Sequence, residues 1–301
     1  MERRKLLTQG LQLCCFFVFT GRAWQHIVWD APYRTLLWDE SLLSTIVPVM
    51  TGMSWNEYAT SPLVDQIING LMVSTGICYL FIGLFALVAH QRSMQKFRKV
   101  LLLGSALLFG LALLYFKEKF YQVGQLFEYS IQFGSPLLLY MALQSELNQK
   151  RLIFFMKVAI ALTFTCHGLY ALGYYPQPGN FVAMTINILP VDEETARGML
   201  KVFGWADILL SILLFVPKAS RWALLYAAIW GLATAVARIW ANIQVDFLFS
   251  SLNQWSFETI MRLPHGIIPL LLISPLREHF RIPFIHLVSG WRVSKYADQT
   301  H

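Results

Sequence analysis

Charged residues are scarce in this chain. Asp, Glu, Lys and Arg make up 14% of its 301 residues, whereas soluble domains carry about 25%. A water-facing surface needs charge and a lipid-facing surface excludes it, so the composition disfavours a soluble protein. The net charge of +7 does not indicate nucleic-acid binding, because the cytoplasmic loops of membrane proteins collect Lys and Arg.

Cysteine is also scarce, and its spacing disfavours several kinds of site. Cys14, Cys15, Cys78 and Cys166 all lie in apolar runs and form no CxxC pair, which gives a zinc or thiol-redox site no support. The sequence also has no phosphate-binding loop, dinucleotide glycine fingerprint, HExxH, CxxCH or nucleophile elbow. These enzyme classes are not indicated, and whether the chain is an enzyme stays open.

Long apolar runs dominate the sequence. A membrane-spanning helix needs about 20 mostly apolar residues. We expect eight such spans near 7–27, 67–90, 100–116, 127–145, 154–174, 202–217, 222–243 and 257–274. They should be helical because a backbone in lipid must satisfy its own hydrogen bonds. No small-residue cleavage site closes the first run, so we expect a retained span. The sequence predicts an all-α, polytopic integral membrane protein.

The charged residues predict the orientation. If both termini are cytoplasmic, the inner segments hold most of the basic residues: Arg3, Arg4, Lys5, Arg92, Lys96, Arg98, Lys99, Lys150, Arg151, Lys157, Lys218, Arg221, Arg277, Arg281, Arg292 and Lys295. The outer segments then hold Asp30, Asp39, Glu40, Glu57, Asp65, Glu118, Asp192, Glu193, Glu194 and Asp246. This follows the positive-inside rule. It places the long loops 28–66 and 175–201 outside, in a cell membrane that we expect to be a bacterial inner membrane.

The two halves of the chain look like copies. The matching features are Phe127-Glu128 and Phe257-Glu258, each followed by a Gly and a Pro; Gly110 and Gly231, each with a base seven residues later; and Gly76 and Gly204. Four spans per half give both copies the same orientation, which predicts a parallel repeat about an axis along the membrane normal. We expect a first four-helix repeat (1–150), a second four-helix repeat (151–275) and a cytoplasmic tail (276–301).

The second half also resembles a known family. It has His167-Gly168 late in a helix, then a long external loop, then Phe203-Gly204-Trp205-Ala206-Asp207 in the next helix. This pattern is similar to the DoxX-like membrane superfamily, which includes the membrane subunit of a thiosulfate–quinone oxidoreductase. The resemblance is best over 158–274, and residues 7–145 join it only through the internal repeat. It implies a four-helix membrane unit, here duplicated, and raises the hypothesis of a quinone-linked role.

Ionisable side chains within the spans are the candidate functional residues, because each costs about 2.5–3.5 kcal/mol at mid-bilayer on insertion scales. Glu258, Arg262 and His265 recur at i, i+4 and i+7, on one face of a helix. We predict His265, Glu258 and His167 as candidate catalytic residues, since histidine can exchange protons near neutral pH. In the alternative interpretation, Glu258 and Arg262 simply pair, and His167 is a packing residue.

The remaining candidates are predicted to bind a ligand: Arg22, His26, Lys117, Glu128, Gln132, Asp207, Arg238, Asn242 and Arg262. In the expected orientation nearly all lie in the outer half of the membrane, with Asp207 and His265 deeper. We therefore expect one or two polar cavities that open outward beneath the long loops. Arg22 could instead extend to the membrane interface, and a buried Asp207 needs a partner on another helix or a raised pKa.

Three functions remain as hypotheses. The first is a quinone-linked redox protein with a membrane or extracytoplasmic partner subunit, and the others are a transporter or lipid-handling protein and a scaffold without chemistry. Quinone is the cofactor that the first hypothesis implies. Haem ligation by two of His26, His167 and His265 has no spacing that brings two of them together, and we predict no metal site. Lys117 is a loose parallel to the reactive lysine of the vitamin K-dependent carboxylase family, without an accompanying motif.

Overall fold

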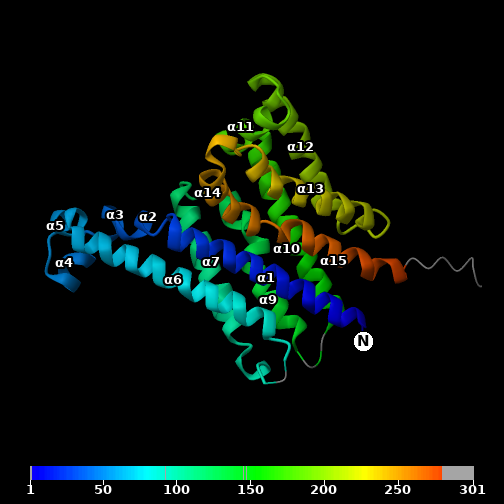
Figure 1. Ribbon diagram of the computed structural model, residues 1–301, viewed down its shortest axis with the longest axis horizontal. Coiled ribbons are helices and arrows are strands. Elements are labelled where there is room, and N and C mark those ends of the chain that lie inside the picture. The colour runs from blue at the N-terminus through cyan, green and yellow to red at the C-terminus, as the bar shows by residue number, and fades with distance from the viewer. Residues whose placement is uncertain (1, 92, 145, 147, 280–301) are drawn as a thin grey trace, which may run out of the picture.

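A computed structural model describes residues 2–91, 93–144, 146 and 148–279, and all regular elements in them are helices (Figure 1). The first half contains α1 (Glu2–Val28), α2 (Arg34–Leu37), α3 (Glu40–Leu43), α4 (Ile46–Thr51), α5 (Trp55–Thr60), α6 (Pro62–Val88), η1 (Gln95–Phe97), α7 (Val100–Glu118), α8 (Val123–Glu128) and α9 (Ser130–Ala142). The second contains α10 (Gln149–Leu172), α11 (Gly179–Ile188), α12 (Glu193–Leu213), α13 (Ser220–Trp240), η2 (Val245–Phe247), α14 (Leu248–Ile260) and α15 (Pro264–His279). Most of the expected tail, 280–301, lies outside the described residues.

Five helical segments of the described chain are long and apolar enough to cross a membrane: Pro62–Val88, Gln95–Glu118, Gln149–Leu172, Ser220–Trp240 and Val245–Ile273. The chain is therefore an α-helical membrane protein. The sequence predicts eight spans, and the three that do not meet this criterion are α1, α9 and α12. With 13 residues, α9 is too short to cross alone, whereas α1 and α12 have 27 and 21 residues and are less apolar.

The helix α1 is less apolar because other helices surround it. It contacts α6, α9, α14 and α15, and Leu11, Cys14 and Val18 have no exposed surface. Polar side chains on such a helix can bond to protein instead of facing lipid. The Gln12 side-chain amide donates to the carbonyls of Ala86 (2.8 Å) and Leu87 (2.7 Å), which lack helical partners at the end of α6.

The long helices pack in pairs along the chain: α1 with α6, α7 with α9, α10 with α12, and α13 with α15. The first helix of each half also lies against the last helices of the other half. Thus α1 contacts α14 and α15, while α10 contacts α8 and α9 (Figure 1). This exchange joins the two halves into one bundle.

The expected fourth and eighth spans are not continuous helices, which corrects the sequence analysis. The helix α8 ends at Glu128 and α9 begins at Ser130, while α14 ends at Ile260 and α15 begins at Pro264. Proline suits the first turn of a helix, where its missing N–H has no helical partner. Glu258 lies before the second break and His265 after it, so they do not share one helical face as predicted.

Glycines bring two helix pairs into backbone contact. A Cβ atom added at Gly168 would lie 2.7 Å from the Gly204 carbonyl oxygen, and one at Gly204 would lie 2.8 Å from that of Gly168. Similarly, a Cβ on Gly231 would lie 2.6 Å from the His265 carbonyl oxygen, and one on Gly266 would lie 2.7 Å from that of Ala228. Small residues allow this close packing of membrane helices. These contacts fix α10 against α12 and α13 against α15.

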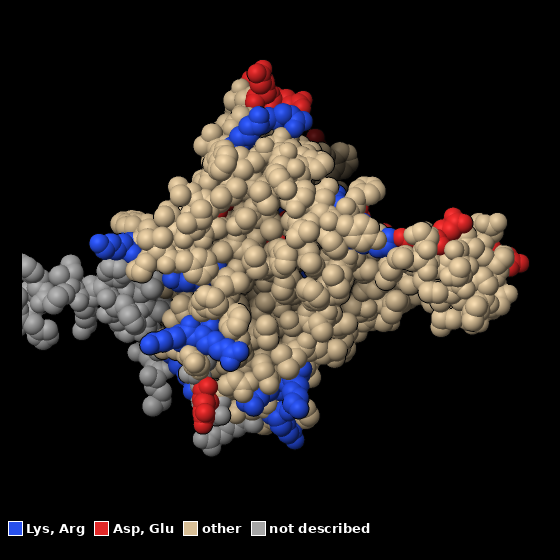
Figure 2. All heavy atoms as spheres, turned by 180° about the vertical axis from the view of Figure 1, so that it is seen from behind, with Lys and Arg blue, Asp and Glu red and all other residues tan. Residues whose placement is uncertain are grey.

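The loops 29–61 and 173–192 lie at one end of the bundle, which we call the loop end. Figure 2 shows a broad surface with almost no charged side chains, acidic groups at the two projecting tips, and most basic groups along the opposite edge. The first loop is fastened to the bundle by Lys117 of α7, which pairs with Asp39, and by Arg34, whose Nη2 lies 2.7 Å from Asp65 Oδ1. Hydrogen bonds from Lys117 and Ser41 lower the pKa of Asp39 to about 2.

We expect Gly168→Val to destabilise the protein by about 1–3 kcal/mol or more, because the added atoms overpack a backbone contact. The measurement is the midpoint of thermal unfolding in detergent. Gly110→Val is the matched control, since a Cβ at Gly110 meets no atom within 4 Å. Equal midpoints for the two variants would contradict the proposed role of the glycine contact.

The Asp39–Lys117 pair predicts pH-dependent order in the first loop. The pKa of Asp39 is lower in the folded protein than its usual value of about 3.9. The pair therefore stabilises the loop above about pH 4 and loses this effect as the pH falls towards 2. We expect pepsin to cut residues 34–61 more slowly in the wild type than in Asp39→Asn at about pH 4. The two rates should converge near pH 2, and a constant ratio would contradict the pairing.

Candidate functional site

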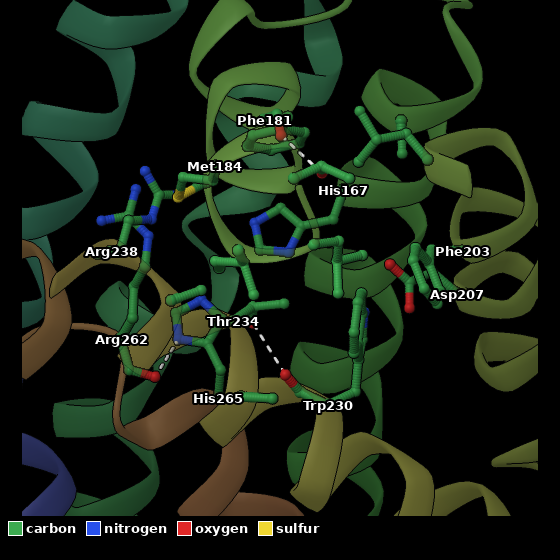
Figure 3. A pocket seen from close by; sticks show the side chains of 17 residues that line it. His167, Phe181, Met184, Phe203, Asp207, Trp230, Thr234, Arg238, Arg262 and His265 are labelled. Carbon is green, nitrogen blue, oxygen red and sulfur yellow. Dashed lines mark hydrogen bonds between the residues drawn. The ribbon is translucent and has the colours of Figure 1, made fainter. Parts of the chain in front are cut away.

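The second half of the chain contains a cavity of about 320 Å³ near the loop end. Its apolar walls include Phe181, Met184, Phe203 and Trp230, and its polar residues are His167, Thr185, Asp207, Thr234, Arg238, Arg262 and His265 (Figure 3). The volume lies at the lower end of the range of roughly 300–1,000 Å³ that small-molecule sites occupy. Mostly apolar walls with a few polar groups are typical of such sites.

One wall of the cavity is α11, from the second long loop. Phe181, Met184 and Ile188 line the cavity at i, i+3 and i+7, which places them on one helical face. Val182 does not line the cavity and packs in a cluster with Ala171, Ala196 and Leu200. These wall residues, as well as Phe203 and Trp230, were not among the site residues predicted from the sequence. The helical spacing within 179–188 was the signal that could have indicated the first three.

Two arginines and one glutamate form a largely buried ion network beside the cavity. Arg238 Nη1 on α13 lies 2.8 Å from Glu258 Oε2 on α14, and Arg262 Nη1 lies 3.1 Å from the same oxygen. The Glu258–Arg262 contact is the one that the alternative interpretation of the sequence expected. It did not predict that Arg238 shares the carboxylate, because this contact depends on the packing of α13 against α14.

Two of the candidate histidines lie together. The rings of His167 on α10 and His265 on α15 are stacked, with centroids 5.8 Å apart and planes 8° apart. His167 Nε2 lies 3.1 Å from Glu128 Oε1, and His265 Nδ1 lies 2.9 Å from the Arg262 carbonyl oxygen. The expectation that nothing brings two of the histidines together is wrong, because it considered only spacing along the chain.

This arrangement of the histidines does not favour a bound metal. Parallel stacked rings direct their nitrogens sideways and not toward a shared point between them. In the described residues no group of three or more His, Cys, Asp or Glu side chains could hold a metal ion.

The network has balanced formal charge when both histidines are neutral. Glu128 and Glu258 supply two negative charges, and Arg238 and Arg262 supply two positive ones. A guanidinium has five N–H donors, and the hydrogen bonds among the described residues use only some of them. The site therefore offers hydrogen-bond donors without excess positive charge, which favours a neutral acceptor such as a carbonyl oxygen.

Arg22, His26 and Gln132 form a separate cluster in the first half. The Arg22 side chain is 1% exposed, and its Nε and Nη2 donate to Gln132 Oε1 over 2.9 and 2.7 Å. Its guanidinium also lies 4.9 Å from the centre of the Tyr129 ring. Arg22 therefore does not extend to the interface. His26 Nδ1 lies 2.7 Å from the Arg22 carbonyl oxygen, so this histidine is held by its own helix.

Two further candidates make local contacts outside the cavity. Lys117 pairs with Asp39 of the first loop. Asn242 donates to the Arg238 carbonyl over 2.8 Å at the end of α13. Asp207, in contrast, lines the cavity. The structure thus gathers His167, Asp207, Arg238, Arg262 and His265 around one space, with Glu128 and Glu258 directly behind it.

Comparison with known protein families, curated proteins and solved structures finds no match to this chain. The assignment of a function therefore rests on the geometry of these residues.

Glu258→Gln leaves the guanidinium groups of Arg238, which is buried, and Arg262, which is partly buried, without their shared carboxylate. Removing one partner from a buried ion network destabilises a protein by about 3–5 kcal/mol, so we expect a large fall in the midpoint of thermal unfolding. Glu193→Gln is the control, because Glu193 pairs with Arg197 in an exposed contact worth about 0–1 kcal/mol. A similar small effect for both variants would show that the buried network does not support the fold.

Proposed function

We propose that this chain is a DoxX-like protein with eight spans in two parallel four-helix repeats. The helix pairing supports this, because α1–α6 and α7–α9 have their counterparts in α10–α12 and α13–α15. Both long loops lie at the same end of the bundle. The termini would be cytoplasmic, in a bacterial inner membrane, since most basic segments lie at the other end.

The equivalence of the halves is looser at some positions. A Cβ on Gly231 would clash with His265, whereas its proposed counterpart Gly110 has open space around it. In the first half, Ser105 Oγ instead donates to the Phe133 carbonyl between α7 and α9 over 2.7 Å. The repeats would therefore share an architecture while packing their third and fourth helices differently.

The proposed activity is binding of a lipid-soluble quinone, as the membrane subunit of a quinone-linked redox system with a partner subunit. The observation that carries this proposal is the combination in one cavity of aromatic walls with the donors of Arg238 and Arg262. Aromatic side chains stack on flat rings, and neutral carbonyl oxygens accept hydrogen bonds from the two arginines. His265 and His167 stand beside this position as candidate proton donors and acceptors.

We expect Ala237→Phe to weaken binding of a short-chain quinone at least tenfold, because the added ring fills the cavity that Ala237 lines. The measurement is quenching of tryptophan fluorescence in purified protein, since Trp230 lines the same space. Ala106→Phe is the matched control: Ala106 is exposed on α7. It should bind quinone like the wild type.

Two results would direct the assignment elsewhere. A phospholipid that copurifies in place of quinone would support the lipid-handling alternative. The scaffold alternative would be supported if the wild-type protein bound neither quinone nor phospholipid and if the Ala237→Phe variant still performed the function of the protein in cells.

A further inference from the structure

One wall residue has no role in the proposed binding of a quinone. Asp207 on α12 is 4% exposed, and its Oδ1 has no hydrogen-bond partner among the described residues. Buried polar atoms are nearly always hydrogen-bonded, and leaving one without a partner is destabilising. The group needs an explanation that the fold itself does not supply.

The Trp230 side chain hydrogen-bonds to the Asp207 carboxyl group, but Asp207 Oδ1 is left without a partner. Ser211, one turn along α12, donates to the main-chain oxygens of Asp207 (2.9 Å) and Ala161 (3.1 Å), not to the Asp207 carboxyl group. On α10 the facing residue is Gly168, where even a Cβ atom would lie 3.3 Å from the Asp207 Cβ. This close contact leaves no room for a polar side chain at that point.

The carboxyl group lies on the opposite side of the cavity from the arginines. Figure 3 shows Asp207 near Phe203 and Trp230 on one side, Arg238 and Arg262 on the other, and the two histidines between them. No ion pair joins Asp207 to either arginine in the described part of the chain, although all three line the same space. The cavity is therefore bipolar, with donors at one end and an unused acceptor at the other.

The proposed repeat aligns Asp207 with Tyr79 of the first half, which has no exposed surface. The Tyr79 ring packs against Phe19, with centroids 5.7 Å apart, and edge-on against His26 at 5.1 Å. Its hydroxyl group also lacks a hydrogen-bond partner among the described residues, but the ring leaves no cavity beside it. A bulky aromatic ring fills this position in one half, whereas a short carboxylic acid borders a cavity in the other.

We propose that Asp207 binds a hydrogen-bond donor, a hydroxyl or amino group, of the ligand in this cavity. The ligand then carries an acceptor at the arginine end and a donor at the Asp207 end. The inference rests on the proposed function only in that it requires a ligand here. Within the quinone class, the reduced quinol is the form with hydroxyl donors, so Asp207 selects the quinol over the quinone.

The first test compares binding of a short-chain benzoquinol, under anaerobic conditions, with that of its quinone. The wild type should bind the quinol at least tenfold more tightly than the quinone. Asp207→Leu should lower quinol affinity at least tenfold and leave quinone affinity unchanged. Asp207→Asn retains an acceptor oxygen and should keep most of the quinol affinity. Equal quinol affinity in the wild type and Asp207→Leu would overturn the inference.

A second test does not depend on quinone. Dicyclohexylcarbodiimide adds to a carboxyl group in apolar surroundings with uptake of one proton, and the adduct rearranges to a stable N-acylurea without a further reactant. Mass spectrometry of the ligand-free protein should locate this adduct at Asp207. Asp192 serves as the internal control: hydrogen bonds from Thr195 lower its pKa, so it stays ionised in water and unmodified. Benzoquinol or micelles containing phosphatidylethanolamine should slow the modification of Asp207 at least fivefold.

The two tests separate the proposals. If the wild type binds neither quinone nor quinol, the proposed quinone function is wrong. Protection of Asp207 by the amine-bearing lipid would then still support the bipolar cavity. If Asp207 is not modified at all, or if no hydroxyl or amine compound slows its modification, the inference is overturned even where quinone binds.

Discussion

The close contact of helix backbones at a few glycines determines the shape of the second half. Gly168 and Gly204 bring α10 against α12, and Gly231 and Gly266 bring α13 against α15. The functional side chains are neighbours of these contacts: His167 precedes Gly168, and His265 precedes Gly266. Because each pair is pressed together at its crossing, space remains between the pairs, and α11 closes part of it. The cavity is thus what remains when two tightly packed pairs cannot also pack tightly against each other.

A second constraint is the satisfaction of buried charge. Arg22 meets amide and aromatic partners, while Arg238 and Arg262 share one carboxylate. These two ways of pairing a buried guanidinium have different effects on the surrounding structure. The first uses the donors of one guanidinium on a neighbouring glutamine and leaves a packed interior, whereas the second leaves donors free beside an open space. Similar residue types therefore make a packed interior in one half and a candidate binding site in the other.

Sequence patterns predicted what depends on local composition. Apolar runs indicated a helical membrane protein, and ionisable residues within them indicated where polar side chains would gather. Contacts between distant segments could not be read in this way. The Arg238–Glu258 pair, the stacking of His167 on His265 and the Lys117–Asp39 contact each depend on which helices are neighbours. The breaks near Tyr129 and Met261 were missed because the apolar runs continue through them.

The contact between Glu128 and His167 joins the halves at the cavity itself. Glu128 ends α8 in the first half, and His167 lines the cavity in the second. A wall of the site therefore takes its position, and its local charge, from a helix of the other half. A shift of α8 relative to α10 would change what the histidine can donate or accept. The cavity of the second half therefore depends on a residue of the first half for one of its contacts.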